Sequence, residues 1–469
     1  MIEKNTKYHG KFYVVNDSLN KTYFSASLCI WDNNKIDLEI SYSSNIIETI
    51  ELTNFLNKTY DFYDIQGCIL INNNKVDVSL INCAVSNSNW QISFDAYDEK
   101  KCINHNYLKI SAAICVFDIL ITSTFLIKKG KYKFSALSNW CDSLSNKKLQ
   151  GSIILESNKN YETVVQNGDK IIIENYFEEM KDCSLVSFVQ TGAFNIEFSN
   201  SVNILEFIEN GRIYNDFFVL MTGQKSNIDN FEVVFDNGLK YYEVYVDRDC
   251  CVSSFINQIC FNFKTLTDNM QIMRNWYEAY KKNNLAYALF FDTIHYREKY
   301  LTDILLDAYI RSFEGMFTKY LEGKSSFISN NKNKKVIKLI KNTIGKEIDS
   351  ILETIDENEV IISDYKDKYK KTILDSFAHA YELSLRSRIE YFFQIHENYF
   401  KEDFTKYDKN DIISQIVAFR NAYAHADDSK LKDYDVIDLC RFSKKMILVH
   451  LYVDILKMEE FQIELEKMY

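Results

Sequence analysis

The chain has 469 residues, of which 46% are hydrophobic and 26% are charged, and its formal net charge is −11 at pH 7. This composition is typical of a globular protein of about two to four domains and excludes a disordered or fibrous chain. The acidic balance argues against a protein that coats nucleic acid without direction, because such proteins carry a basic excess that neutralises phosphates. Any contact with nucleic acid is therefore expected to be local.

The cysteine pattern and the first residues favour a cytoplasmic location. The eleven cysteines include no CxxC pair, and most lie in apolar runs such as SLCIWD and AAICVF. Such runs favour buried, reduced thiols over a zinc site or a disulfide framework. The opening sequence MIEKNTKYHG is polar throughout, unlike a signal peptide. We expect neither a metal nor a cofactor.

One segment approaches the length of a transmembrane span, namely residues 110–127, ISAAICVFDILITSTFLI. Asp118 lies at its centre, where a charge in hydrocarbon would cost about 3 kcal/mol. The segment is also rich in β-branched residues, which favour strands. We interpret it as buried strands and predict no membrane partner.

Residues 1–130 are predicted to form a β-rich domain. Short runs of alternating apolar and polar residues, such as KFYVV, IDLEISY and KVDVSLINCAV, are separated by polar turns such as DNNK and NNNK. A period of two is typical of strands that bury one face. This domain is expected to be a sandwich or a barrel.

Residues 131–270 are predicted to form a mixed α/β regulatory region. Strand-like runs such as GSIILES, KIIIENYFEEM and LKYYEVYVD flank the helical stretch VNILEFIENGRIYNDFFVLMTG. Four apolar residues fit one helical face loosely: Leu205, Ile208, Ile213 and Phe217. The chain has no proline and only twelve glycines, so the boundaries rest on clusters of Asn, Asp, Ser and Lys.

Residues 271–469 are predicted to form an all-α domain, because apolar residues recur there at helical spacing in five segments. The first three stripes are Leu301, Leu305, Tyr309, Phe313, Met316, Phe317 and Tyr320; Ile337, Ile340, Ile344, Ile348 and Ile351; and Phe377, Tyr381, Leu385, Ile389 and Phe392. The last two are Ile412, Ile413, Ile416 and Val417; and Val436, Leu439, Cys440, Met446, Ile447 and Leu451. The whole chain is therefore predicted to be an α+β multidomain protein that ends in a helical bundle.

The fourth of these helices, with Asn410 or Asp411 as its expected N-cap, carries the residues best suited to chemistry. Its end reads AFRNAYAHADDS and includes Arg420, Asn421 and His425. A helix turns by about 100° per residue, so Asn421 and His425 lie nearly one above the other, whereas Arg420 and His425 diverge by about 140°. Either the helix frays near His425, or the arginine reaches round, or a second copy of the helix supplies the partner across a twofold axis. The last option makes the active unit a dimer.

These three residue types suit cleavage of an RNA phosphodiester. A histidine that titrates near pH ~6.5 takes the proton of a ribose 2′-hydroxyl or returns one to the 5′-oxygen. A guanidinium binds the phosphate oxygens where charge develops, and Asn421 orients the histidine or the phosphate. The 2′-hydroxyl is an internal nucleophile, so no metal is required. The expected products carry 2′,3′-cyclic phosphate and 5′-hydroxyl ends, and DNA should survive.

Arg420, Asn421 and His425 spell R-N-x-x-x-H, which resembles the signature of the HEPN ribonucleases. It is the only Arg-x4-His in the chain. The flanking segments FAHAYELSLRSRIEYFF and YDVIDLCRFSKKMILVHLYVDIL resemble the helices on either side of the motif helix in that superfamily. The resemblance implies a HEPN bundle over residues 271–469 that acts as a metal-independent endoribonuclease and forms a homodimer.

The amino-terminal region carries a second resemblance. The segments YHGKFYVV, KTYFSASLCIWDNNKIDLEI, LSNWC and ILEFIENGRIYNDFFVLMTG are similar to the amino-terminal region of ApeA-type proteins, bacterial anti-phage proteins with a carboxy-terminal HEPN domain. The proline that such regions usually carry near the first strands is missing here. The resemblance implies defence by abortive infection, with tRNA or other structured RNA as substrate. From the domain order alone, we expect the amino-terminal modules to keep the nuclease silent until a phage-derived trigger arrives.

Two carboxylates are candidates for supporting the motif. Glu314 lies on the otherwise apolar first bundle helix, where it either contacts the motif arginine or forms a structural ion pair. Asp427 follows His425 closely and either hydrogen-bonds the histidine, raising its pKa, or lies in a solvated turn.

Basic residues near the motif are candidates for binding RNA. The stretch NKNKKVIKLIKNTIGK includes Lys334, Lys335, Lys338 and Lys341, which either steer phosphate or form a solvated helix face. Arg386 and Arg388 on the third helix either bind RNA phosphate or serve the surface.

Two other functions fit the same sequence. One is a non-catalytic HEPN bundle that binds RNA or scaffolds a complex and retains the motif for dimer packing. The other is a HEPN toxin of a two-gene module that a neighbouring protein neutralises. A DNA nuclease is disfavoured, because no carboxylates cluster at metal-binding spacing.

Overall fold

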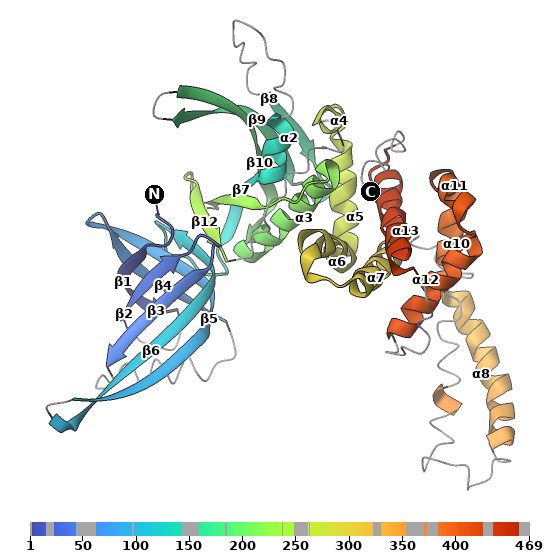
Figure 1. Cartoon of the computed structure of the whole chain (residues 1–469), viewed down its shortest axis with the longest axis horizontal. Helices are drawn as coiled ribbons and strands as arrows, with labels where there is room; N and C mark the ends of the chain where they lie inside the picture. Colours follow the sequence, from blue (N-terminus) through green and yellow to red (C-terminus); the bar gives the residue numbers. More distant parts are fainter. Residues whose placement is uncertain are drawn as a thin grey trace, which may run out of the picture. The chain divides into compact units, whose positions relative to one another are not determined.

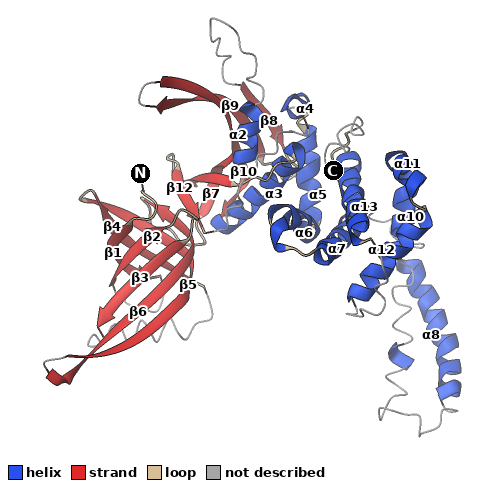
Figure 2. Ribbon diagram, viewed as in Figure 1, coloured by secondary structure: helices blue, strands red, loops and turns tan. Residues whose placement is uncertain are grey.

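The protein forms two compact units, residues 1–278 and residues 279–469. The computed structural model describes residues 2–15, 23–43, 62–95, 98–142, 159–182, 185–236, 238–247, 261, 263–321, 330–352, 370–372, 383–424 and 435–458. All described strands lie in the first unit, and the described elements of the second unit are helical (Figures 1 and 2). The predicted α+β class is therefore confirmed. The predicted domain limits at residues 130 and 270 stay a prediction.

The first six strands close into an antiparallel barrel. They are β1 (Lys7–Val14), β2 (Phe24–Ile30), β3 (Ile36–Ser43), β4 (Tyr63–Ile71), β5 (Asn74–Asp95) and β6 (Asp98–Phe117). Their order is β3-β2-β1-β4-β5-β6, and β3 also pairs with β6, which closes the ring. Alternate side chains point inward into an apolar core that contains Phe12, Leu28, Leu38, Ile69 and Ile110. Of the predicted sandwich or barrel, the structure has the barrel.

The sheet continues beyond the barrel. Strand β6 pairs with β12 (Tyr242–Val246), and the order then runs through β11 (Ile228–Phe235), β7 (Leu126–Phe134), β10 (Leu185–Asn203), β9 (Lys170–Asp182) and β8 (Lys159–Val164). Residues 110–127 thus contain the end of β6, a turn and the start of β7. Asp118 has a left-handed φ of 65° at the point where β6 ends. The segment was correctly interpreted as strands, but its centre is a turn.

Helices cover the second part of this sheet. Helix α3 (Ile204–Thr222) packs on β7 and β10, and its ends are capped by Asn203 and Gly223. Ile213 and Phe217 are buried as predicted, whereas Leu205 is 41% exposed. Helix α2 (Ser135–Asp142) packs on β10, and α4 (Phe263–Asp268) follows later in the chain.

In the second unit, α7 (Thr302–Tyr320) is the central helix and contacts α6, α10, α12 and α13. The described elements are α5 (Gln271–Lys282), which crosses the limit between the units, α6 (Asn284–His295), η2 (Arg297–Lys299), α7, α8 (Asn330–Leu352), α10 (Leu385–Ile395), α11 (Glu397–Lys406), α12 (Lys409–Ala424), α13 (Val436–Val449) and the π-helical turn η6 (His450–Ile455). The predicted stripe on α7 is buried from Leu305 to Phe317, but its ends, Leu301 and Tyr320, are 72% and 40% exposed.

The other four predicted stripes have mixed outcomes. Their described residues fall on α8, α10, α12 and α13, except Leu451, which lies on η6. On α8, Ile348 is buried, whereas Ile351 is 61% exposed. Phe377 and Tyr381 lie outside the described residues.

Within the part of the chain that the structure describes, no helix has the length and apolarity needed to cross a membrane.

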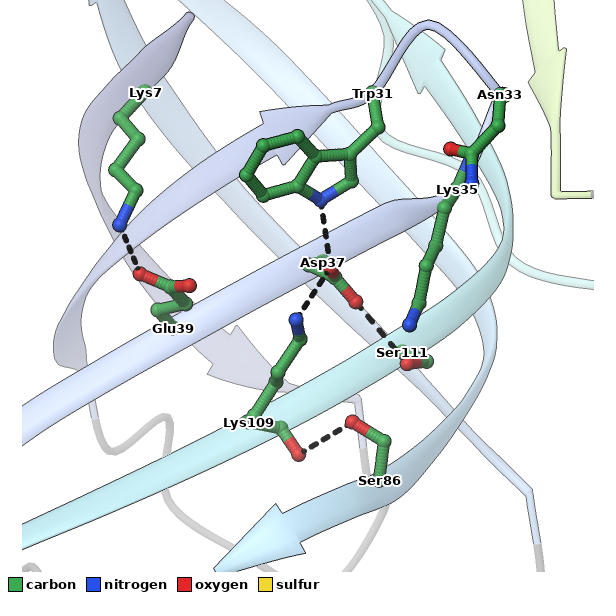
Figure 3. A network of polar contacts seen from close by, with 9 residues as sticks. All are labelled: Lys7, Trp31, Asn33, Lys35, Asp37, Glu39, Ser86, Lys109 and Ser111. Carbon is green, nitrogen blue, oxygen red and sulfur yellow. Dashed lines mark hydrogen bonds and ion pairs between the residues drawn. The ribbon is translucent and has the colours of Figure 1, made fainter. Parts of the chain in front are cut away.

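A buried carboxylate lies on the outer face of the barrel (Figure 3). Asp37 on β3 is only 1% exposed, although its neighbours Ile36 and Leu38 are the residues that face the apolar core. Trp31 Nε1 donates a hydrogen bond to Asp37 Oδ2 at 2.6 Å, and Lys109 Nζ lies 2.7 Å from the same oxygen. Ser111 Oγ donates to Asp37 Oδ1 at 3.2 Å. The ion pair with Lys109 therefore compensates a charge that water does not reach.

Candidate functional site

Arg420 and Asn421 lie near the end of α12. The helix begins at Lys409, and the Asp408 side chain accepts a hydrogen bond from the Asp411 backbone N–H at 2.9 Å. Asp408 is thus the N-cap, and the prediction of Asn410 or Asp411 was wrong by two or three positions. The buried face consists of Ile412, Ile413, Ile416, Phe419 and Ala422. Asn421 is exposed, and the Arg420 side chain is 37% exposed.

The motif arginine lies beside a carboxylate from α7. Glu314 Oε2 is 3.7 Å from Arg420 Nη2, and Glu314 Oε1 accepts a hydrogen bond from Arg388 Nη1 on α10 at 2.9 Å. Three helices thus bring one carboxylate and two guanidinium groups together. The contact that Glu314 was suggested to make with the motif arginine is present. His425 and Asp427 lie outside the described residues, so their predicted roles stay predictions.

Arg386 and Arg388 have different surroundings, although both were candidates for binding RNA. Arg388 is only 8% exposed and is paired with Glu314, so its guanidinium lies beneath the surface. The Arg386 side chain is 43% exposed; it donates to Ser414 Oγ at 2.9 Å and lies 3.7 Å from Glu390. The Arg386 guanidinium is therefore accessible from solvent, which leaves both of its predicted roles open, whereas the Arg388 guanidinium is internal.

The lysine-rich stretch forms α8. Lys335 and Lys338 are exposed on this helix, whereas the side chains of Lys334 and Lys341 lie outside the described residues. Exposure is compatible with steering of phosphate and with a solvated helix face. The predicted choice between these two roles therefore stays open.

Two family models cover nearly the whole chain. Residues 7–276 match ApeA N-terminal domain 1. The chain belongs to the ApeA family. Residues 275–459 match Apea-like HEPN, and this range contains the R-N-x-x-x-H motif, Glu314 and Arg388. Both resemblances inferred from the sequence are thereby confirmed, and the matches support a HEPN nuclease in anti-phage defence. No match was found among curated proteins or among solved structures.

This ApeA-type protein also has a buried polar cluster that sequence reasoning missed. His396 Nε2 lies 3.0 Å from Asp454 Oδ2, and His450 Nδ1 lies 2.8 Å from the same oxygen. All three side chains are at most 7% exposed, and Lys457 lies over the nearby ring of Tyr320. The spacing of His450 and Asp454, four residues apart on a helix, was the signal available, whereas His396 joins them only through the fold.

Burial and hydrogen bonding shift the protonation of this cluster. Burial lowers the pKa of His450 below its ordinary value of 6.5. Burial alone would raise the pKa of Asp454, but the hydrogen bonds from His396 and His450 together hold it well below 3.8. As pH falls, the unfolded chain therefore takes up these protons before the folded chain does, and the folded state loses stability.

We expect the free energy of unfolding of the second unit to fall as pH is lowered below about 6.5, with a slope of up to about 1.4 kcal/mol per pH unit for one proton. Urea unfolding of the full chain between about pH 5 and pH 8 measures this slope. His450→Asn is the matched control, because its amide nitrogen replaces Nδ1 as a donor to Asp454 but does not titrate. An equal slope in wild type and in His450→Asn would contradict the assignment of this pH dependence to His450.

Proposed function

We propose that the protein is a metal-independent endoribonuclease of the HEPN type in which Arg420, Asn421 and His425 carry the reaction. The observation that carries this proposal is the position of Arg420, which lies partly exposed at the meeting of α7, α10 and α12 inside the range that matches Apea-like HEPN. A guanidinium in such a place is available to a phosphate.

The proposed reaction is an internal transesterification. His425 removes the proton of a ribose 2′-hydroxyl, and the 2′-oxygen attacks the adjacent phosphorus. The bond from phosphorus to the 5′-oxygen breaks, and that oxygen takes up a proton. Arg420 stabilises the negative charge that develops on the phosphate oxygens, and Asn421 orients the phosphate or the histidine. The products are a 2′,3′-cyclic phosphate and a 5′-hydroxyl.

We propose a homodimer through the HEPN domain as the active unit. Arg420 and His425 are five residues apart, a spacing that separates two side chains by about 140° on an ideal helix, so we propose that the arginine of one protomer meets the histidine of its partner. The exposed Lys335, Lys338 and Arg386, together with Lys334 and Lys341, are proposed to guide the RNA by charge.

In the cell, the proposed role is abortive infection in the cytoplasm, with tRNA as the main substrate. Residues 1–270 would keep the nuclease silent until a phage-derived trigger binds. The support is the domain order, with ApeA N-terminal domain 1 in front of the HEPN range.

The test is incubation of the purified full chain with total tRNA in excess EDTA, with and without extract from phage-infected cells. We expect cleavage of tRNA under at least one of these conditions, and no cleavage of single-stranded DNA of matched sequence. Binding of tRNA without cleavage in both would contradict the proposal and favour the non-catalytic HEPN bundle. Dependence on a product of a neighbouring gene would favour the two-gene toxin.

A further inference from the structure

Arg388 holds a charge that is nearly inaccessible to water. The residue is 8% exposed, and its Nε has no hydrogen-bond partner among the described residues. A buried ion is tolerated in a protein only if an opposite charge compensates it. Glu314, at 2.9 Å from Arg388 Nη1, supplies that charge. The first function of Glu314 is therefore to compensate Arg388.

The same carboxylate binds Arg420 only loosely. Glu314 Oε2 lies 3.7 Å from Arg420 Nη2, which is beyond the range of a hydrogen bond. Arg420 is therefore paired with Glu314 by charge but is not hydrogen-bonded to it, and its side chain remains 37% exposed. The cluster of two guanidinium groups and one carboxylate also keeps a net charge of one positive unit. That excess charge favours a phosphate beside Arg420.

We propose that Arg388 is a positioning residue that acts on Arg420 through Glu314. By binding the carboxylate, Arg388 keeps it from closing onto Arg420 and leaves the Arg420 guanidinium available to a phosphate. This inference rests on the proposed function for its biological meaning. In this proposal Arg388 does not touch RNA. Its indirect role replaces the direct phosphate contact that was one of the two roles expected from the sequence.

The accessibility of Arg420 tests the proposal without any catalytic assay. Phenylglyoxal modifies free arginine side chains, and peptide mass spectrometry of the full chain gives the rate at each site. In Arg388→Met, we expect Arg420 to be modified about two- to fivefold more slowly, which is the effect that a partly exposed ion pair allows. In the double variant Arg388→Met/Glu314→Gln, the rate should return to the wild-type value, because no carboxylate remains to close onto Arg420.

Arg441 on α13 is the matched internal control. Its side chain is 43% exposed and lies 3.4 Å from Asp438, away from the cluster, so its rate should be the same in every variant. Arg388→Gln, which keeps a donor to Glu314 and removes the charge, is a second variant should Arg388→Met fail to fold. An Arg420 rate that is unchanged or faster in the folded single variant, or that stays slow in the double variant, would overturn the proposal.

Cleavage kinetics provide a second readout. Arg388→Met should raise KM for tRNA more than it lowers kcat, and Glu314→Gln should restore KM in the double variant. If Arg388 served only packing, a second substitution in the same cluster would not rescue the first. A wild-type protein that fails to cleave RNA would refute the proposed function, while the modification rates of Arg420 would still decide the role of Arg388.

Discussion

Replacement of His425 or Arg420 by alanine is expected to lower the rate of RNA cleavage by about 10²-fold or more, which is the usual contribution of a general base or of a group that stabilises developing charge. The two losses should not multiply, because both residues act on the same step. Fragment yield from tRNA under single-turnover conditions measures the effect. Arg420 is partly exposed near the end of α12, so Arg420→Ala should change stability little.

Arg441→Ala is the control for a general loss of positive charge. It removes a similarly exposed arginine from α13 and should retain nearly full activity. If His425→Ala cleaved RNA at the wild-type rate, this histidine would have no part in the mechanism. RNA affinity gives the complementary comparison: a non-catalytic binder would retain its affinity in His425→Ala and would have no activity to lose.

Lys109→Met is expected to destabilise the first unit by about 3 kcal/mol, because it leaves a buried carboxylate without its counter-charge. Asp37 is 1% exposed and has Lys109 as its ion partner at 2.7 Å. The hydrogen bonds from Trp31 and Ser111 remain but do not neutralise the charge. Urea unfolding of the full chain at neutral pH, followed by circular dichroism of the strands, measures the change.

The neighbouring pair Lys7–Glu39 provides the matched control for this prediction (Figure 3). The Lys7 side chain is 51% exposed, so Lys7→Met should cost less than about 1 kcal/mol. The double variant Lys109→Met/Asp37→Asn should recover part of the stability lost by Lys109→Met alone. If Lys109→Met and Lys7→Met lowered the free energy of unfolding equally, the burial of Asp37 would not determine the size of the loss.

The strands of the barrel could be predicted because each strand buries one face, which imposes a period of two on the sequence. The barrel's closure could not be predicted in the same way. It depends on the pairing of β3 with β6, in which Leu38 lies opposite Ile110, and the local pattern of either strand fits a sandwich equally well. The same limit applies to the continuation of the sheet from β6 into β12.

Part of the candidate site was predictable from local spacing in the sequence, and the rest depends on contacts between helices. The motif is visible in the sequence as the spacing of Arg420 and Asn421 to His425, and Glu314 was noticeable as a carboxylate on an apolar helix. Arg386 and Arg388 looked equivalent in sequence, but residues two apart on a helix point about 160° away from each other. One therefore faces the solvent and the other faces the core, and which is which depends on the contact between α10 and α7.

The most direct test of the account is the chemistry of the RNA ends that the wild-type protein produces in excess EDTA. The account predicts a 2′,3′-cyclic phosphate and a 5′-hydroxyl, and no cleavage of a substrate whose ribose at the cleavage site lacks the 2′-hydroxyl. A 3′-hydroxyl with a 5′-phosphate, or cleavage of the 2′-deoxy substrate, would contradict it.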